Sequence, residues 1–114
     1  MNISEIRDII ISGKNLNIQD KNGMTPLMTA VDLQDIALTK KLLSMKVKID
    51  LQDKYGQTAL MLAAGRNFTM AVKLLIAEKA NLKLISKSGL TALGFAKDNN
   101  CVESVELLKK AGAK

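Results

Sequence analysis

The sequence predicts an all-α protein, a solenoid of helix-turn-helix repeats with short hairpin-like turns between them. The first observation behind this prediction is a period of 33 residues, which separates Gly23, Gly56 and Gly89. Four more columns keep this interval, and they contain Thr25, Thr58 and Thr91; Leu27, Leu60 and Leu93; Ala30, Ala63 and Ala96; and Leu42, Leu75 and Leu108. Because five independent columns share one period, the chain is predicted to consist of stacked copies of one unit.

The second observation is the turn that opens each unit. Each glycine ends a polar tetrapeptide, the clearest being Asp20–Gly23 and Asp53–Gly56. Glycine tolerates the positive φ that a tight turn requires. A threonine follows two residues later and can cap a helix with its hydroxyl group, and Pro26 suits a first helical position. The pattern predicts that a helix starts directly after each threonine.

The third observation is apolar spacing, which predicts two helices in each unit. Short apolar helices are expected over residues 27–31, 60–64 and 93–96. Longer helices are indicated by apolar residues at helical spacing: Ile36, Leu38, Leu42 and Leu43; Phe68, Ala71, Val72, Leu75 and Ile76; and Val102, Val105 and Leu108. Five methionines (Met24, Met28, Met45, Met61 and Met70) follow the repeat, so we expect them to fill gaps in the packing and not to bind a metal.

We expect a single domain of residues 1–114, with full repeats at 20–52 and 53–85 and a C-terminal capping repeat at 86–114. Residues 2–19 match only the second half of a repeat, a helix over Ile3 to Ile11 and its exit. Ile3, Ile6, Ile9 and Ile10 give this helix an apolar stripe. Because no short helix precedes it, we expect Ile11 to be exposed and residues 2–12 to support weak self-association.

Composition excludes two common catalytic mechanisms and one common metal site. The chain has no His and a single cysteine, so neither a Ser-His-Asp nor a Cys-His mechanism is available, and no Cys-rich zinc site can form. Asp50 and Asp53 lie in a predicted turn and are expected to hold it, and Cys101 is expected to be a small, partly buried residue at a helix start. The sequence therefore predicts a protein that is not an enzyme and has no cofactor and no metal.

Charge and hydropathy argue against two further classes of partner, nucleic acids and membranes. The net charge of +6 is spread along the chain, and aromatic residues make up only 3%, which disfavours a nucleic-acid interface. No apolar stretch approaches the ~20 residues that cross a bilayer. Glu5 and Asp8 stand where a signal peptide has basic residues, so we expect a cytoplasmic location with no membrane partner. The high Lys, Ile and Asn content suggests a bacterial source.

The repeat resembles the ankyrin repeat, whose signature is Thr-Pro-Leu-His-x-Ala. Here the signature reads TPLMTA over residues 25–30, TALMLA over 58–63 and TALGFA over 91–96. The histidine of the family is replaced by Met28, Met61 and Gly94, so the hydrogen bonds that it makes between repeats are absent. Ala59 and Ala92 replace two prolines.

The resemblance implies a non-enzymatic module that binds a partner protein through a concave face of turn tips and short-helix ends. Carried over by position, this face contains Lys21, Asn22, Met24, Leu33, Lys54, Tyr55, Gln57, Arg66, Lys87, Ser88, Leu90 and Asn99. Met24, Leu33, Tyr55 and Leu90 are apolar or aromatic where neither turn geometry nor core packing requires it. The alternative is a structural or capping subunit that docks onto further repeats or a second copy, and nucleic-acid binding is a distant third.

Overall fold

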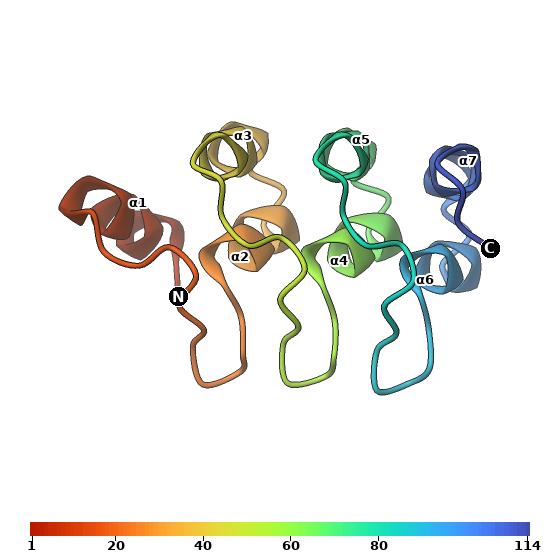
Figure 1. Cartoon of the computed structure of the whole chain (residues 1–114), viewed down its shortest axis with the longest axis horizontal. Helices are drawn as coiled ribbons and strands as arrows, with labels where there is room; N and C mark the ends of the chain where they lie inside the picture. Colours follow the sequence, from red (N-terminus) through yellow and green to blue (C-terminus); the bar gives the residue numbers. More distant parts are fainter.

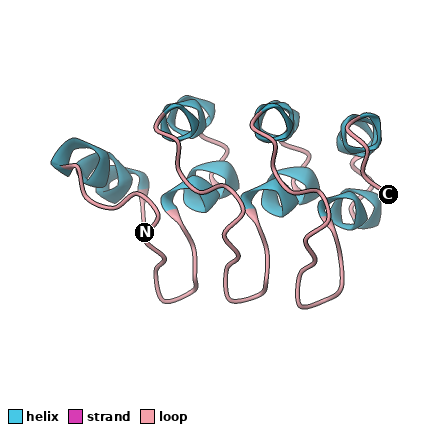
Figure 2. Ribbon diagram, viewed as in Figure 1, coloured by secondary structure: helices cyan, strands magenta, loops and turns pink.

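The computed structural model describes all of residues 1–114 and contains seven helices and no strand (Figures 1 and 2). They are α1 (Ile3–Ser12), α2 (Pro26–Asp32), α3 (Ile36–Ser44), α4 (Ala59–Gly65), α5 (Thr69–Ala77), α6 (Ala92–Asp98) and α7 (Val102–Lys110). The short helices α2, α4 and α6 form one layer and the longer α3, α5 and α7 a second, and three hairpins project from the same side (Figure 1). The predicted all-α solenoid is confirmed. Its division at residues 20, 53 and 86 stays a prediction.

The predicted threonine caps are present in all three short helices. The hydroxyl oxygen of each threonine accepts the backbone N–H three residues later, at 3.1 Å for Thr25 and 3.2 Å for both Thr58 and Thr91. Pro26 occupies the first position of α2, where a backbone N–H would have no partner within the helix, so its absence costs no hydrogen bond. The starts of the short helices are therefore set by the same hydroxyl group in each repeat.

One continuous apolar core runs through both helical layers. Its 22 buried residues are mainly leucine and alanine, and the three leucines of the longer-helix column, Leu42, Leu75 and Leu108, are fully buried. The alanines of the short helices are also fully buried, which lets α2, α4 and α6 pack side by side. The 33-residue columns thus mark the residues that one repeat buries against the next.

Two of the methionines expected to fill gaps do not do so, and one residue of the apolar spacing does not reach the core. Val102 is 65% exposed because it is the first residue of α7, and the core is contacted instead by Cys101 just before it. Met45 is the cap residue that follows α3, and Met70 lies on the exposed side of α5, so neither fills a gap. Met28 and Met61, in contrast, are buried as expected.

Helix α1 packs on α2 at one end of the solenoid. Ile6 is fully buried, while Ile3, Ile9 and Ile10 are half-buried and Ile11 is 83% exposed, as expected. The stripe is therefore only partly covered within the chain. None of the seven helices is both long and apolar enough to cross a lipid bilayer.

Candidate functional site

The tips of the hairpins are held in a fixed row by backbone hydrogen bonds between repeats. The N–H of Lys54 donates to the carbonyl of Asn22, and the N–H of Lys87 donates to the carbonyl of Tyr55, both at 2.9 Å. The side chain of Gln52 donates to the carbonyls of Gly56 and Ile85, at 2.9 and 3.1 Å, and so ties two consecutive hairpins together. We call these linked tips the tip row. It comprises Lys21 and Asn22, Lys54 and Tyr55, and Lys87 and Ser88.

The turn carboxylates build the hairpins, as the sequence predicts. The Oδ1 atom of Asp53 accepts the backbone N–H groups of Tyr55 and Gln57, both at 2.9 Å. Asp20 makes the equivalent bonds one repeat earlier. Asp50 accepts the N–H of Asn81 at 2.9 Å. These carboxylates accept backbone N–H groups, and none of them forms an ion pair with a lysine of the tip row.

Lys54 and Tyr55 present a cation and a ring at the middle of the tip row. The ammonium group of Lys54 donates to Asn22 Oδ1 at 2.9 Å and lies 5.1 Å from the centre of the Tyr55 ring. This distance permits a cation–π attraction. Tyr55 is nevertheless 58% exposed. Both side chains are thus restrained while remaining open to a partner.

A hollow of about 290 Å³ lies between the tip row and the ends of the short helices α2 and α4. Six of the residues predicted for the binding face line it, namely Asn22, Met24, Lys54, Tyr55, Gln57 and Arg66. The structure therefore brings half of the predicted set into one place, where hairpin and helix residues border the same space.

Three further residues line the hollow and were not predicted for the binding face: Asp32, Leu62 and the turn residue Asp53. Asp32 pairs with Arg66 at 2.7 Å between Oδ1 and Nη2, and Leu62 of α4 contributes an apolar wall. Opposite charges at the ends of successive short helices were the signal that could have revealed the pair. Because both side chains are partly exposed, the pair contributes only about 0–1 kcal/mol to stability. Its main effect is to fix the Arg66 guanidinium inside the hollow.

The other predicted residues lie outside this hollow. Lys21, Leu33, Lys87, Ser88 and Asn99 are exposed. The Asn99 side chain also donates to the carbonyl of Gly65 at 3.0 Å, which joins α6 to α4.

The expectation that packing does not use Met24 and Leu90 is wrong. Met24 is half-buried against the core. Leu90 is half-buried against α6, where a Cβ on Gly94 would come within 3.1 Å of its side chain. Gly94 therefore makes room for Leu90 in the last repeat.

Neither a metal-binding cluster nor an exposed thiol is found in the structure. No three His, Cys, Asp or Glu side chains gather where they could hold a metal ion. Cys101 is buried, and its sulfur lies 3.6 Å from the carbonyl of Gly65. The arrangement of stacked helix pairs with projecting hairpins is that of a helical repeat protein.

Comparison with known families is consistent with this description. Residues 30–114 match the family model for ankyrin repeats (3 copies), and the chain therefore belongs to the ankyrin-repeat family. Ankyrin repeats are generally protein–protein interaction modules, and the family is typically non-enzymatic. No curated protein matches the chain.

Proposed function

We propose that this chain binds a partner protein through its concave face, defined as the tip row together with the hollow beside it. The observation that carries the proposal is the exposed Lys54–Tyr55 pair, which is restrained at the centre of the tip row and lines the hollow. Restrained aromatic and basic side chains lose little conformational entropy on binding and often dominate an interface.

The charge of the tip row supports an acidic stretch on the partner. Lys21, Lys54 and Lys87 recur at one position of successive hairpins, and all three are exposed. The nearest turn carboxylates, Asp20 and Asp53, are engaged by backbone amides. A partner that supplies carboxylates along the row would meet a complementary potential, which increases both association rate and specificity.

Tyr55→Ala is expected to weaken partner binding by at least ~2 kcal/mol, because a central ring is lost from the interface. Stability should stay within ~0.5 kcal/mol of the wild type. The backbone groups of residue 55 keep their bonds to Asp53 and Lys87 when the ring is removed. Capture of a partner from native lysate, followed by titration of wild type and variant, measures the loss. Binding unchanged by the variant would remove Tyr55 from the site.

A second candidate function, association through the first helix, is favoured by the exposure of Ile11. This side chain is 83% exposed at the end of α1, beside a stripe that the chain only partly covers. Under this alternative, the mass measured by sedimentation rises with concentration, and Ile11→Ser returns it to that of a monomer. A monomer at all concentrations excludes this alternative and leaves the concave-face proposal intact.

A further inference from the structure

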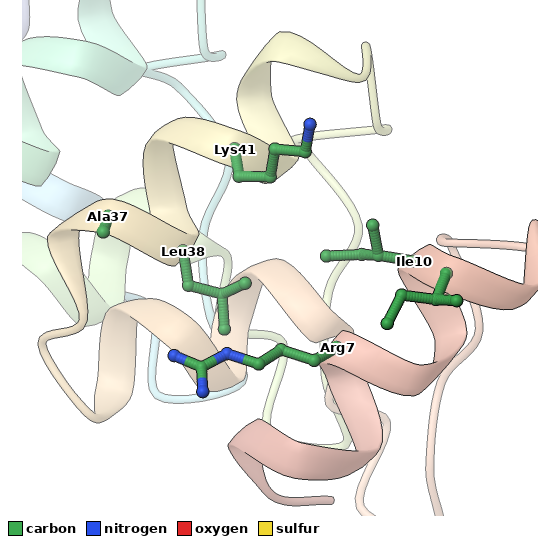
Figure 3. Close-up of a pocket in the computed structure, with 6 residues that line it drawn as sticks. Arg7, Ile10, Ala37, Leu38 and Lys41 are labelled. Carbon is green, nitrogen blue, oxygen red and sulfur yellow. The ribbon is translucent and has the colours of Figure 1, made fainter.

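A groove separates α1 from α3 on the side of the molecule formed by the longer helices α3, α5 and α7, which we call the outer helices. Its volume is about 320 Å³, and it is lined by Arg7, Ile10 and Ile11 of α1 and by Ala37, Leu38 and Lys41 of α3 (Figure 3). Elsewhere the outer helices pack directly, α3 on α5 and α5 on α7, whereas α1 rests on α2 (Figure 1). We call this space the α1–α3 groove.

The groove combines an apolar lining with two unpaired cations. Ile10, Ile11, Ala37 and Leu38 supply its apolar surface. The two ion pairs of the protein join the N-terminal amino group to Asp20 and Arg66 to Asp32, so neither involves a cation of the groove. Arg7 and Lys41 therefore face this apolar surface without an anionic partner.

The helices beside the groove add no acid to it. Helix α3 contains no Asp or Glu, and the Asp35 carboxylate that caps it accepts the Leu38 N–H at 3.0 Å. Helix α1 carries Glu5 and Asp8, but neither lines the groove. Arg7 and Lys41 are therefore the only charged residues that line the groove.

We propose that the α1–α3 groove binds an acidic amphipathic helix of a partner protein. Apolar side chains of that helix lie on Ile11, Ala37 and Leu38, and its carboxylates pair with Arg7 and Lys41. The volume is at the lower limit of ligand pockets, roughly 300 Å³, so it suits one or two side chains better than a free small molecule.

Charge favours a different protein over a second copy as the occupant. Ile11 lies one helical turn from both Arg7 and Asp8, but only Arg7 lines the groove with it, so a second α1 that docks through this side brings its own Arg7. That guanidinium would meet Arg7 and Lys41, and like charges at an interface suppress association. An acidic helix has the opposite effect.

A peptide selection on the full chain tests this assignment. The probe is a displayed library of amphipathic helical peptides, about 16 residues long, with polar positions randomised among acidic, basic and neutral residues. Selection runs in parallel on the wild type, on Arg7→Glu/Lys41→Glu, and on Lys73→Glu/Lys97→Glu. The last variant makes the same change in net charge at exposed lysines outside the groove.

Wild type and control variant should both enrich acidic peptides, whereas Arg7→Glu/Lys41→Glu should enrich basic ones. The best acidic peptide should bind Arg7→Glu/Lys41→Glu at least about tenfold more weakly, and it should shift the amide resonances of α1 and α3. Because Arg7 and Lys41 are exposed, melting should be unchanged. The proposal would be overturned by any one of four results. These are selection of neutral peptides, selection of the same peptides by all three chains, resonance shifts at the tip row, or a dimer with Ile11 at its interface. None of these outcomes depends on Tyr55.

Discussion

Leu75→Ala should lower the free energy of unfolding by about 2–5 kcal/mol, the usual range for truncation of a buried leucine. Leu75 is fully buried in α5, the middle of the outer helices, with α3 on one side and α7 on the other. The cavity therefore opens where the interfaces with both neighbouring helices meet. In a short array, where each repeat is stabilised mainly by its neighbours, this loss is a large fraction of the total stability.

Chemical denaturation of the variant checks this value, and Leu33→Ala is the matched control. Leu33 is 55% exposed at the end of α2, so the same truncation there should change stability by no more than ~0.5 kcal/mol. Equal losses in the two variants would show that Leu75 is not at the centre of a stacked core.

Gly56→Ala should destabilise the protein by about 2–5 kcal/mol, through two additive effects. Gly56 has a φ of 75°, a conformation in which a side chain adds about 1–2 kcal/mol of strain. A Cβ there would also lie 2.9 Å from the backbone nitrogen of Lys87 in the next hairpin. Because that contact is with backbone, relief requires the hairpins to move apart, which adds about 1–3 kcal/mol.

Gly89→Ala separates the two effects. Gly89 has nearly the same backbone, with a φ of 82°, but a Cβ at this position meets nothing within 4 Å. Only the backbone strain of about 1–2 kcal/mol should remain. Thermal melting of the two variants measures the difference, and equal melting temperatures would contradict the close approach of hairpins that forms the tip row.

The repeated part of the fold could be predicted from the sequence because the same residue types cap the helices and fill the core in each repeat. The threonine caps and the leucines equivalent to Leu75 occupy columns, and a column is visible without any structure. Residues at helix ends were harder to place. The spacing that puts Val105 and Leu108 against the core also included Val102, but Val102 is the first residue of α7 and is 65% exposed.

The candidate site could be predicted only in outline, because its contacts are not repeated. The bond from Lys54 to Asn22 needs a hydrogen-bond acceptor at the preceding tip. For Lys87 the equivalent residue is Tyr55, which presents a ring instead. Asp32 and Arg66 likewise form a single pair between two repeats. The period therefore located the concave face, while the pairings inside it depended on individual residues.

The α1–α3 groove could not be predicted from the periodicity. The apolar spacing of α1 is that of an outer helix, and by analogy with α3 and α5 it would pack on its outer neighbour. In the structure α1 rests on α2, and a groove separates it from α3. How far α1 turns from the outer helices depends on three-dimensional packing at the end of the solenoid, which a repeat pattern does not describe.

Binding of a captured partner to Tyr55→Ala and to Lys73→Ala tests the central claim most directly. Tyr55 lies on the concave face, and Lys73 is an exposed lysine on α5 in the outer layer. If the concave face is the binding site, calorimetric titration should show a loss of at least ~2 kcal/mol for Tyr55→Ala. Lys73→Ala should bind as the wild type does. Weakened binding of Lys73→Ala with unchanged binding of Tyr55→Ala would place the partner on the outer helices and contradict the proposed function.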